Sequence, residues 1–146
     1  MNSHLSVAVE EFLKTPPFVL SAVQKRGEFL SIINQLTEFH RGSCQEYGQI
    51  VGSVFGSCPP AETLEEVPFI PVRLFKSLLL SSIDESDVVK TMMSSGTSGQ
   101  TPSRIVLDRA TSSSQTRALT QIMTSVLGKG RHPMLIADSE AVVKRS

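Results

Sequence analysis

Hydrophobic residues in the first half of the chain recur every three to four positions, in three successive stretches. This is the spacing of a helix with one apolar face. We expect the three faces to form core, because apolar stripes of this kind are usually buried. The stretches contain, in order, Leu5, Val9, Phe12 and Leu13; Phe29, Ile32, Ile33, Leu36 and Phe39, with Gly27 as a candidate break; and Tyr47, Ile50, Val51, Val54 and Phe55, ending near Gly56.

Residues that start and stop helices separate these stretches. Pro16-Pro17 should end the first, since proline removes a backbone donor and clashes with the preceding turn. Ser21 with Gln24, and Ser43 with Glu46, have the spacing of a capping box, in which two side chains satisfy helix N-terminal donors. The sequence therefore predicts three helices within a helical N-terminal region, 1–56.

The segment 57–86 lacks a clear period and is expected to connect two regions. Ser57–Glu66 has the composition of a loop, and its acidic residues are expected to be solvated. Val67–Pro71 contains two prolines, which exclude a central strand and favour an extended segment. Pro71 suits the first turn of a short helix, which we place at Val72–Leu80.

The second half changes character. Val88–Met93 and Arg104–Asp108 are expected to form two antiparallel strands. A long helix should follow, with Ser112 and Gln115 as a third capping box, and Met134–Ala137 should form a short buried strand. The helix carries the clearest apolar stripe of the chain: Ala118, Leu119, Ile122, Met123, Val126 and Leu127, with Gly128 as the stop.

This order of elements predicts an α/β fold: a helical N-terminal half followed by a β-β-α-β unit of a small mixed sheet. The last region, 87–146, would be the start of an α/β core. About three strands are few against the usual five or six, so we expect the chain to be part of a larger domain or enzyme.

Composition narrows the function classes. The chain has 146 residues, with 14 Lys and Arg against 14 Asp and Glu, so its zero net charge gives no reason to expect nucleic acid. Its first residues, Met1-Asn2-Ser3-His4, do not predict a signal peptide, and no apolar run approaches the roughly 20 residues of a membrane span. The two cysteines, Cys44 and Cys58, and three dispersed histidines have no metal-ligand spacing. We expect a cytoplasmic protein with reduced, buried or half-buried thiols.

The strongest candidate for chemistry is the uncharged run Ser94–Ser103 between the two expected strands. Six of its residues carry hydroxyls and two are glycine. A loop of this composition can turn several backbone N–H groups toward one point, which binds anions such as phosphate. The competing interpretation is a Ser/Gly-rich hairpin tip without a ligand.

The loop and its surroundings resemble a known family. Ser94–Gly99 resembles the phosphate loop of the adenylate-forming superfamily, in which a strand leads into a Ser/Thr/Gly loop. Val67–Lys76, the loop, Ser103–Ile105 and Leu135–Ser139 together resemble the LuxE-type acyl-protein synthetases of bacterial luminescence. The resemblance covers Val67 to the C-terminus, about half of the chain.

The resemblance implies a two-step reaction. A fatty acid or related carboxylate would attack ATP, with Mg²⁺, to give an acyl adenylate and pyrophosphate. The acyl group would then move to a cysteine on the enzyme, ready for an acyl reductase. The acceptor cysteine, the acyl pocket and the adenine pocket would lie further along a longer chain, so this segment alone is expected to be inactive.

The resemblance also implies the nucleotide-binding residues. Many superfamily members have Pro-Lys soon after the loop; this chain has Pro102-Ser103-Arg104, so Arg104 would replace that lysine, with a planar fork in place of a point charge. In the strand that follows, Ile105 and Leu107 share the face expected to be core. The candidate set is Ser94, Ser95, Gly96, Thr97, Ser98, Gly99 and Arg104.

The alternative function belongs to another class: a non-catalytic helical interaction module with a flexible Ser/Gly-rich loop.

Overall fold

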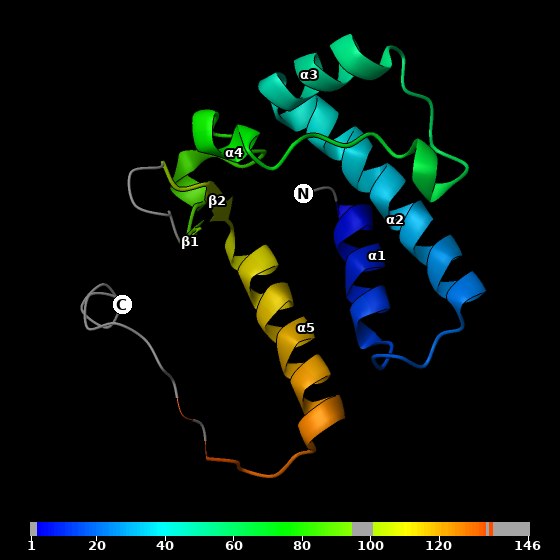
Figure 1. Cartoon of the computed structure of the whole chain (residues 1–146), viewed down its shortest axis with the longest axis vertical. Helices are drawn as coiled ribbons and strands as arrows, with labels where there is room; N and C mark the ends of the chain where they lie inside the picture. Colours follow the sequence, from blue (N-terminus) through cyan, green and yellow to red (C-terminus); the bar gives the residue numbers. More distant parts are fainter. Residues whose placement is uncertain (1–2, 95–100, 134, 136–146) are drawn as a thin grey trace.

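The computed structural model describes residues 3–94, 101–133 and 135, and shows a mixed α/β fold with a helical N-terminal half (Figure 1). The fold class expected from the sequence is thereby confirmed. The elements are α1 (Ser3–Lys14), α2 (Ala22–Ser43), α3 (Gln45–Phe55), η1 (Leu64–Glu66), α4 (Leu74–Ser77), η2 (Glu85–Asp87), β1 (Lys90–Met93), β2 (Arg104–Leu107) and α5 (Arg109–Leu127).

Helix α1 lies between α2 and α5 and contacts both (Figure 1). An ion pair between Glu10 of α1 and Arg117 of α5, at 3.9 Å, joins helices from opposite ends of the sequence. This arrangement brings α5, which follows the strands, back against the N-terminal helices.

The expected capping box at the start of α2 is confirmed. The Ser21 hydroxyl accepts a hydrogen bond from the Gln24 backbone at 3.3 Å, and the Gln24 side chain accepts one from the Ser21 backbone at 3.1 Å. The break expected at Gly27 is wrong, since α2 runs through it. A glycine costs a helix about 1 kcal/mol, too little to interrupt one of this length.

The capping box expected at Ser43 and Glu46 is also wrong. Ser43 is still the last residue of α2, and Cys44 in extended conformation is both the C-cap of α2 and the N-cap of α3. The corner is tight: a Cβ on Gly48 would lie 2.7 Å from the Arg41 carbonyl oxygen. At the other end, Gly56 ends α3 with a φ of 70°, which glycine adopts without strain.

Side chains of α2 hold the connecting segment in place. The Asn34 amide donates to the Ala61 carbonyl and accepts from the Ala61 N–H, both at 2.9 Å. Arg41 donates to the Cys58 carbonyl at 3.3 Å. The loop expected here contains the short helix η1, and the helix expected at Val72–Leu80 is confined to α4.

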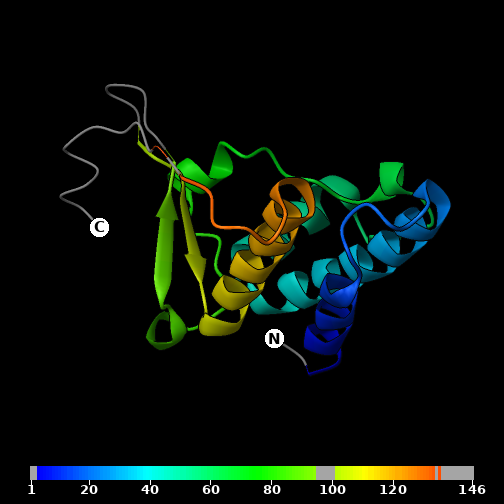
Figure 2. The same cartoon turned by 90° about the horizontal axis from the view of Figure 1, so that it is seen from below.

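The two expected strands pair antiparallel, with Met93 opposite Arg104 and Lys90 opposite Leu107 (Figure 2). Leu107 is buried as expected, whereas Ile105 is 43% exposed. The described part of the sheet has two strands, and α5 begins beside Leu107, so the end of β2 near Arg104 is less covered. Of the buried third strand expected at Met134–Ala137, residues 134, 136 and 137 lie outside the described residues. Leu135 is described, but it is 95% exposed and belongs to no strand.

Helix α5 begins earlier than its expected capping box at Ser112 and Gln115. Asp108, directly after β2, is the N-cap, and its carboxylate accepts the Thr111 N–H at 2.7 Å. Ser112 is therefore inside the helix, where its N–H bonds the Asp108 carbonyl. The expectation that this box starts the helix is wrong, because an earlier residue already satisfies the N-terminal donors.

The described core is small. The buried hydrophobic residues are Cys44, Val51, Ala61 and Leu107. The apolar stripe of α5 is exposed, with Leu119 at 62% and Val126 at 70%. The spacing of these residues predicts the helix α5 correctly. Burial of the stripe would need a covering surface, which the described residues do not provide.

Candidate functional site

The ends of the candidate phosphate loop are tied together at the top of the hairpin. The Ser94 N–H donates to the Ser103 carbonyl at 3.1 Å, and the Ser103 N–H donates to the Ser94 hydroxyl at 2.9 Å. Ser103 is buried, and Met93 and Arg104 pair one step further down. The hairpin thus presents the loop from a hydrogen-bonded base.

The structure describes two of the seven candidate residues. Ser94 and Arg104 lie at the two ends of the loop, brought together by the hairpin register. The other five candidates, Ser95, Gly96, Thr97, Ser98 and Gly99, lie outside the described residues. Arg104 is exposed and makes no ion pair with any residue that the structure describes. Among the described residues, no acidic side chain competes with an anion for its guanidinium.

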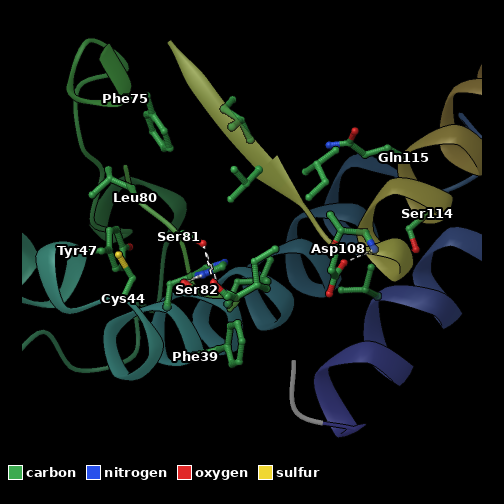
Figure 3. A pocket seen from close by; sticks show the side chains of 18 of the residues that line it. Phe39, Cys44, Tyr47, Phe75, Leu80, Ser81, Ser82, Asp108, Ser114 and Gln115 are labelled. Carbon is green, nitrogen blue, oxygen red and sulfur yellow. Dashed lines mark hydrogen bonds between the residues drawn. The ribbon is translucent and has the colours of Figure 1, made fainter. Parts of the chain in front are cut away.

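A second feature is a cavity of about 600 Å³ that lies between the helices and is lined on one side by β2 (Figure 3). Its walls come from α1, α2, α3, the segment around α4, β2 and α5. The lining is largely apolar and includes Val9, Leu13, Phe39, Phe75, Leu80 and Leu107. Cavities of this size and polarity are typical of small-molecule sites.

One polar pair in this cavity joins distant parts of the chain. Nδ1 of His40 in α2 lies 2.7 Å from the hydroxyl of Ser82, which follows α4. The rings of Phe39 and Tyr47 contact His40 edge-on, at centroid distances of 5.1 and 6.2 Å. Burial lowers the pKa of His40 from its usual 6.5, because desolvation disfavours the imidazolium. His40 is thus an uncharged hydrogen-bonding group at neutral pH.

Acid should destabilise the fold through His40. Below the ordinary pKa of about 6.5 the unfolded chain binds a proton that the folded chain still excludes, so the free energy of unfolding falls as pH falls through that range. The His40→Gln variant should show a flatter dependence between about pH 7 and pH 5 than the wild type, measured by urea unfolding. The exposed His132→Gln variant is the control. Equal slopes for all three proteins would contradict this role.

Two other titratable groups of the cavity are also perturbed. Burial raises the pKa of Tyr47, which keeps its phenol neutral. Hydrogen bonds from the hydroxyl and then the backbone of Thr111 lower the pKa of Asp108, which keeps its carboxylate charged. Figure 3 shows Asp108 well apart from Ser82 across the cavity. Asp108 is therefore a fixed negative charge away from the neutral pair.

The cysteines are as expected from the sequence. Cys44 is buried and lines the cavity, Cys58 is half-buried, and both are free thiols. Within the described residues, no three His, Cys, Asp or Glu side chains are grouped to hold a metal ion. None of the described helices is long and apolar enough to cross a membrane.

Sequence patterns did not reveal the cavity. His40 and Ser82 are 42 positions apart. Ser82 follows the apolar run Leu78–Leu80 and His40 follows Phe39, but no spacing connects the two. The only local signal was a histidine beside the apolar face of α2.

The match to a protein family decides the affiliation of the chain. The family model described as acyl-protein synthetase, LuxE, matches residues 4–142. The chain belongs to the LuxE family. The match extends the resemblance, which began at Val67, back across all three N-terminal helices. The α2 wall of the cavity is therefore part of the LuxE domain, as is the loop. Neither the curated proteins nor the solved structures gave a match.

Proposed function

We propose that the protein activates a fatty acid, or a related carboxylic acid, with ATP and transfers the acyl group to a protein thiol. The observation that carries the proposal is membership of the LuxE family together with the Ser/Thr/Gly loop of this chain. The loop leaves β1 and returns to β2 at a base closed by Ser94 and Ser103. The reaction class is that of a ligase.

The residues fit a polyphosphate. Hydroxyl and backbone donors dominate the run from Ser94 to Ser103, and the run contains no Asp or Glu to repel phosphate. Arg104 adds a cation at its end, without a competing ion pair among the described residues. In this proposal Ser94–Gly99 and Arg104 hold the pyrophosphate part of ATP. Mg²⁺, when bound with ATP, offsets further negative charge on the phosphates.

The reaction balances in two steps. A carboxylate oxygen attacks the α-phosphorus of ATP, the bond to the β-phosphate oxygen breaks, and pyrophosphate leaves. A thiolate then attacks the acyl carbonyl, and AMP leaves with the bonding electrons. The role proposed for this segment is to hold the leaving pyrophosphate and offset its charge. Cys44 is too buried to be the acceptor thiol, and we place the acceptor elsewhere in the protein.

An acyl reductase is the natural consumer of the product, since an acyl thioester is a good substrate for reduction. We place both proteins in the cytoplasm. A link to bioluminescence follows from the family name alone.

A non-catalytic interaction module is the second candidate, and one observation favours it. The exposed stripe of α5, which includes Leu119 and Val126, presents several neighbouring apolar side chains that a partner protein could cover. A module of this kind would bind a protein and would not turn over ATP.

The experiment that separates the two is exchange of radiolabelled pyrophosphate into ATP. The full-length protein should catalyse exchange that depends on an added carboxylic acid, with fatty acids the best of a panel, because the first step is reversible. Omitting the acid is the control. Absence of exchange with every acid, in a protein shown to be folded, would overturn the proposed activity and leave the interaction module.

A further inference from the structure

The lining of the cavity between the helices favours ligands with a hydrocarbon chain. Its walls are mostly aliphatic and aromatic, as expected for a site that takes up hydrocarbon. Its volume of about 600 Å³ falls within the usual range of ligand sites, roughly 300–1,000 Å³. An extended aliphatic chain would replace water against these walls, which is favourable in proportion to the apolar area covered.

The polar groups of the cavity restrict the head group of such a chain. Among the described lining residues there is no Lys or Arg to pair with a carboxylate. The titratable groups that face the cavity are His40, Cys44, Tyr47 and Asp108. The Asp108 carboxyl, whose pKa is lowered by its hydrogen bonds from Thr111, is charged at neutral pH and would repel an anion. A carboxylate here would have no cation to pair with, and hydroxyl and amide donors such as Ser82 and Gln115 would replace only part of its hydration.

The same groups suit an uncharged, hydrogen-bonding head. His40 and Ser82 form a neutral pair, whereas the Ser81 hydroxyl beside them is already bonded to the Ile83 backbone (Figure 3). An imidazole and a hydroxyl can each both donate and accept hydrogen bonds. An alcohol, aldehyde or ester oxygen would therefore find a partner at this end of the cavity.

We propose that this cavity binds an aliphatic chain with an uncharged oxygen-bearing head group, placed at the His40–Ser82 pair. The same chemistry is present in an acyl ester or thioester and in a long-chain aldehyde or alcohol. None of the described loop residues, Ser94 and 101–103, lines the cavity, and its occupancy does not depend on ATP chemistry. An experiment can therefore disprove binding in this cavity without disproving the proposed ATP-dependent activity, and the reverse.

The test is displacement of the neutral fluorescent probe 1-aminoanthracene from the purified full-length protein at neutral pH. Four competitors of matched length are compared: 1-decanol, methyl decanoate, decanoate and decyltrimethylammonium. The two neutral ligands should compete at least about tenfold more tightly than decanoate. Decanoate competing as well as 1-decanol would overturn the choice of head group, and failure of the probe to bind would overturn the site, because another part of the protein would then fill it.

Two variants of α5 locate the binding. Ala118 lines the cavity, whereas Ala110 is exposed in the first turn of the same helix. Ala118→Phe should weaken 1-decanol about tenfold by filling the cavity, and Ala110→Phe should leave binding unchanged. Equal effects of the two variants would place the binding elsewhere and overturn the proposal.

A third variant tests the head-group contact. Ser82→Ala should weaken 1-decanol several-fold but leave decane, which has no head group, unaffected. Equal loss for both ligands would indicate a collapsed cavity and contradict the proposed contact. Circular dichroism spectra matching the wild type establish that each variant is folded.

Discussion

Replacing Arg104 with alanine should lower carboxylate-dependent pyrophosphate exchange by about a hundredfold. Arg104 is the cation that follows the loop, and it makes no ion pair with any described residue. Charge builds up on the pyrophosphate as the α-phosphorus is attacked, and a guanidinium beside it stabilises the transition state more than the ground state. The measurement is the rate of label exchange under saturating ATP and fatty acid.

A matched control lies at the opposite end of the hairpin. Lys90 is an exposed cation on the partner strand, three pairs away from the loop. Lys90→Ala should leave the exchange rate within about twofold of the wild type, since charges beyond a Debye length are largely screened. Arg104→Lys should recover part of the activity because it restores the charge without the planar fork. Equal loss in Arg104→Ala and Lys90→Ala would contradict a specific role for Arg104.

Elements set by local sequence were predictable in this chain. The Ser21–Gln24 capping box and the stop at Gly56 both depend on residues within one helical turn. The hairpin was also predictable, because two apolar runs flank an uncharged loop. The LuxE family could be predicted for the same reason, since its motifs are short and lie in the expected order along the chain.

Predictions failed where two local signals competed. Ser43 has capping-box spacing with Glu46, but it remains in α2, and Cys44 starts α3. Ser112 has the same spacing with Gln115, but Asp108 already caps α5. A capping residue stabilises a helix by only about 1 kcal/mol, so neighbouring candidates are close in energy and chain context decides between them.

The exposure of the α5 stripe and the presence of the cavity could not be predicted from the sequence, for a different reason. The stripe of α5 has the spacing of a buried face, yet spacing does not say what covers it. The His40–Ser82 contact depends on how α2 packs against the segment after α4. Such contacts are properties of tertiary structure, and one sequence contains no separate signal for them.

Replacing Val51 with aspartate should destabilise the fold by about 4 kcal/mol or more, a large part of the 5–15 kcal/mol typical of a whole domain. Val51 is 0% exposed and is the largest fully buried side chain among the described residues. A carboxylate there would have neither water nor a cation. Urea unfolding followed by circular dichroism measures the change.

Val54, three positions further along α3, provides the matched control. It is 66% exposed, so Val54→Asp should change the free energy of unfolding by less than about 0.5 kcal/mol. If Val51→Asp yields no folded protein, Val51→Ala keeps the measurement possible, with an expected loss of about 2 kcal/mol from the lost apolar contacts and the space they leave. Similar stabilities for the Val51 and Val54 aspartate variants would show that α3 does not pack on the core through Val51. In that case the face of α3 assigned here as buried would have to be reassigned.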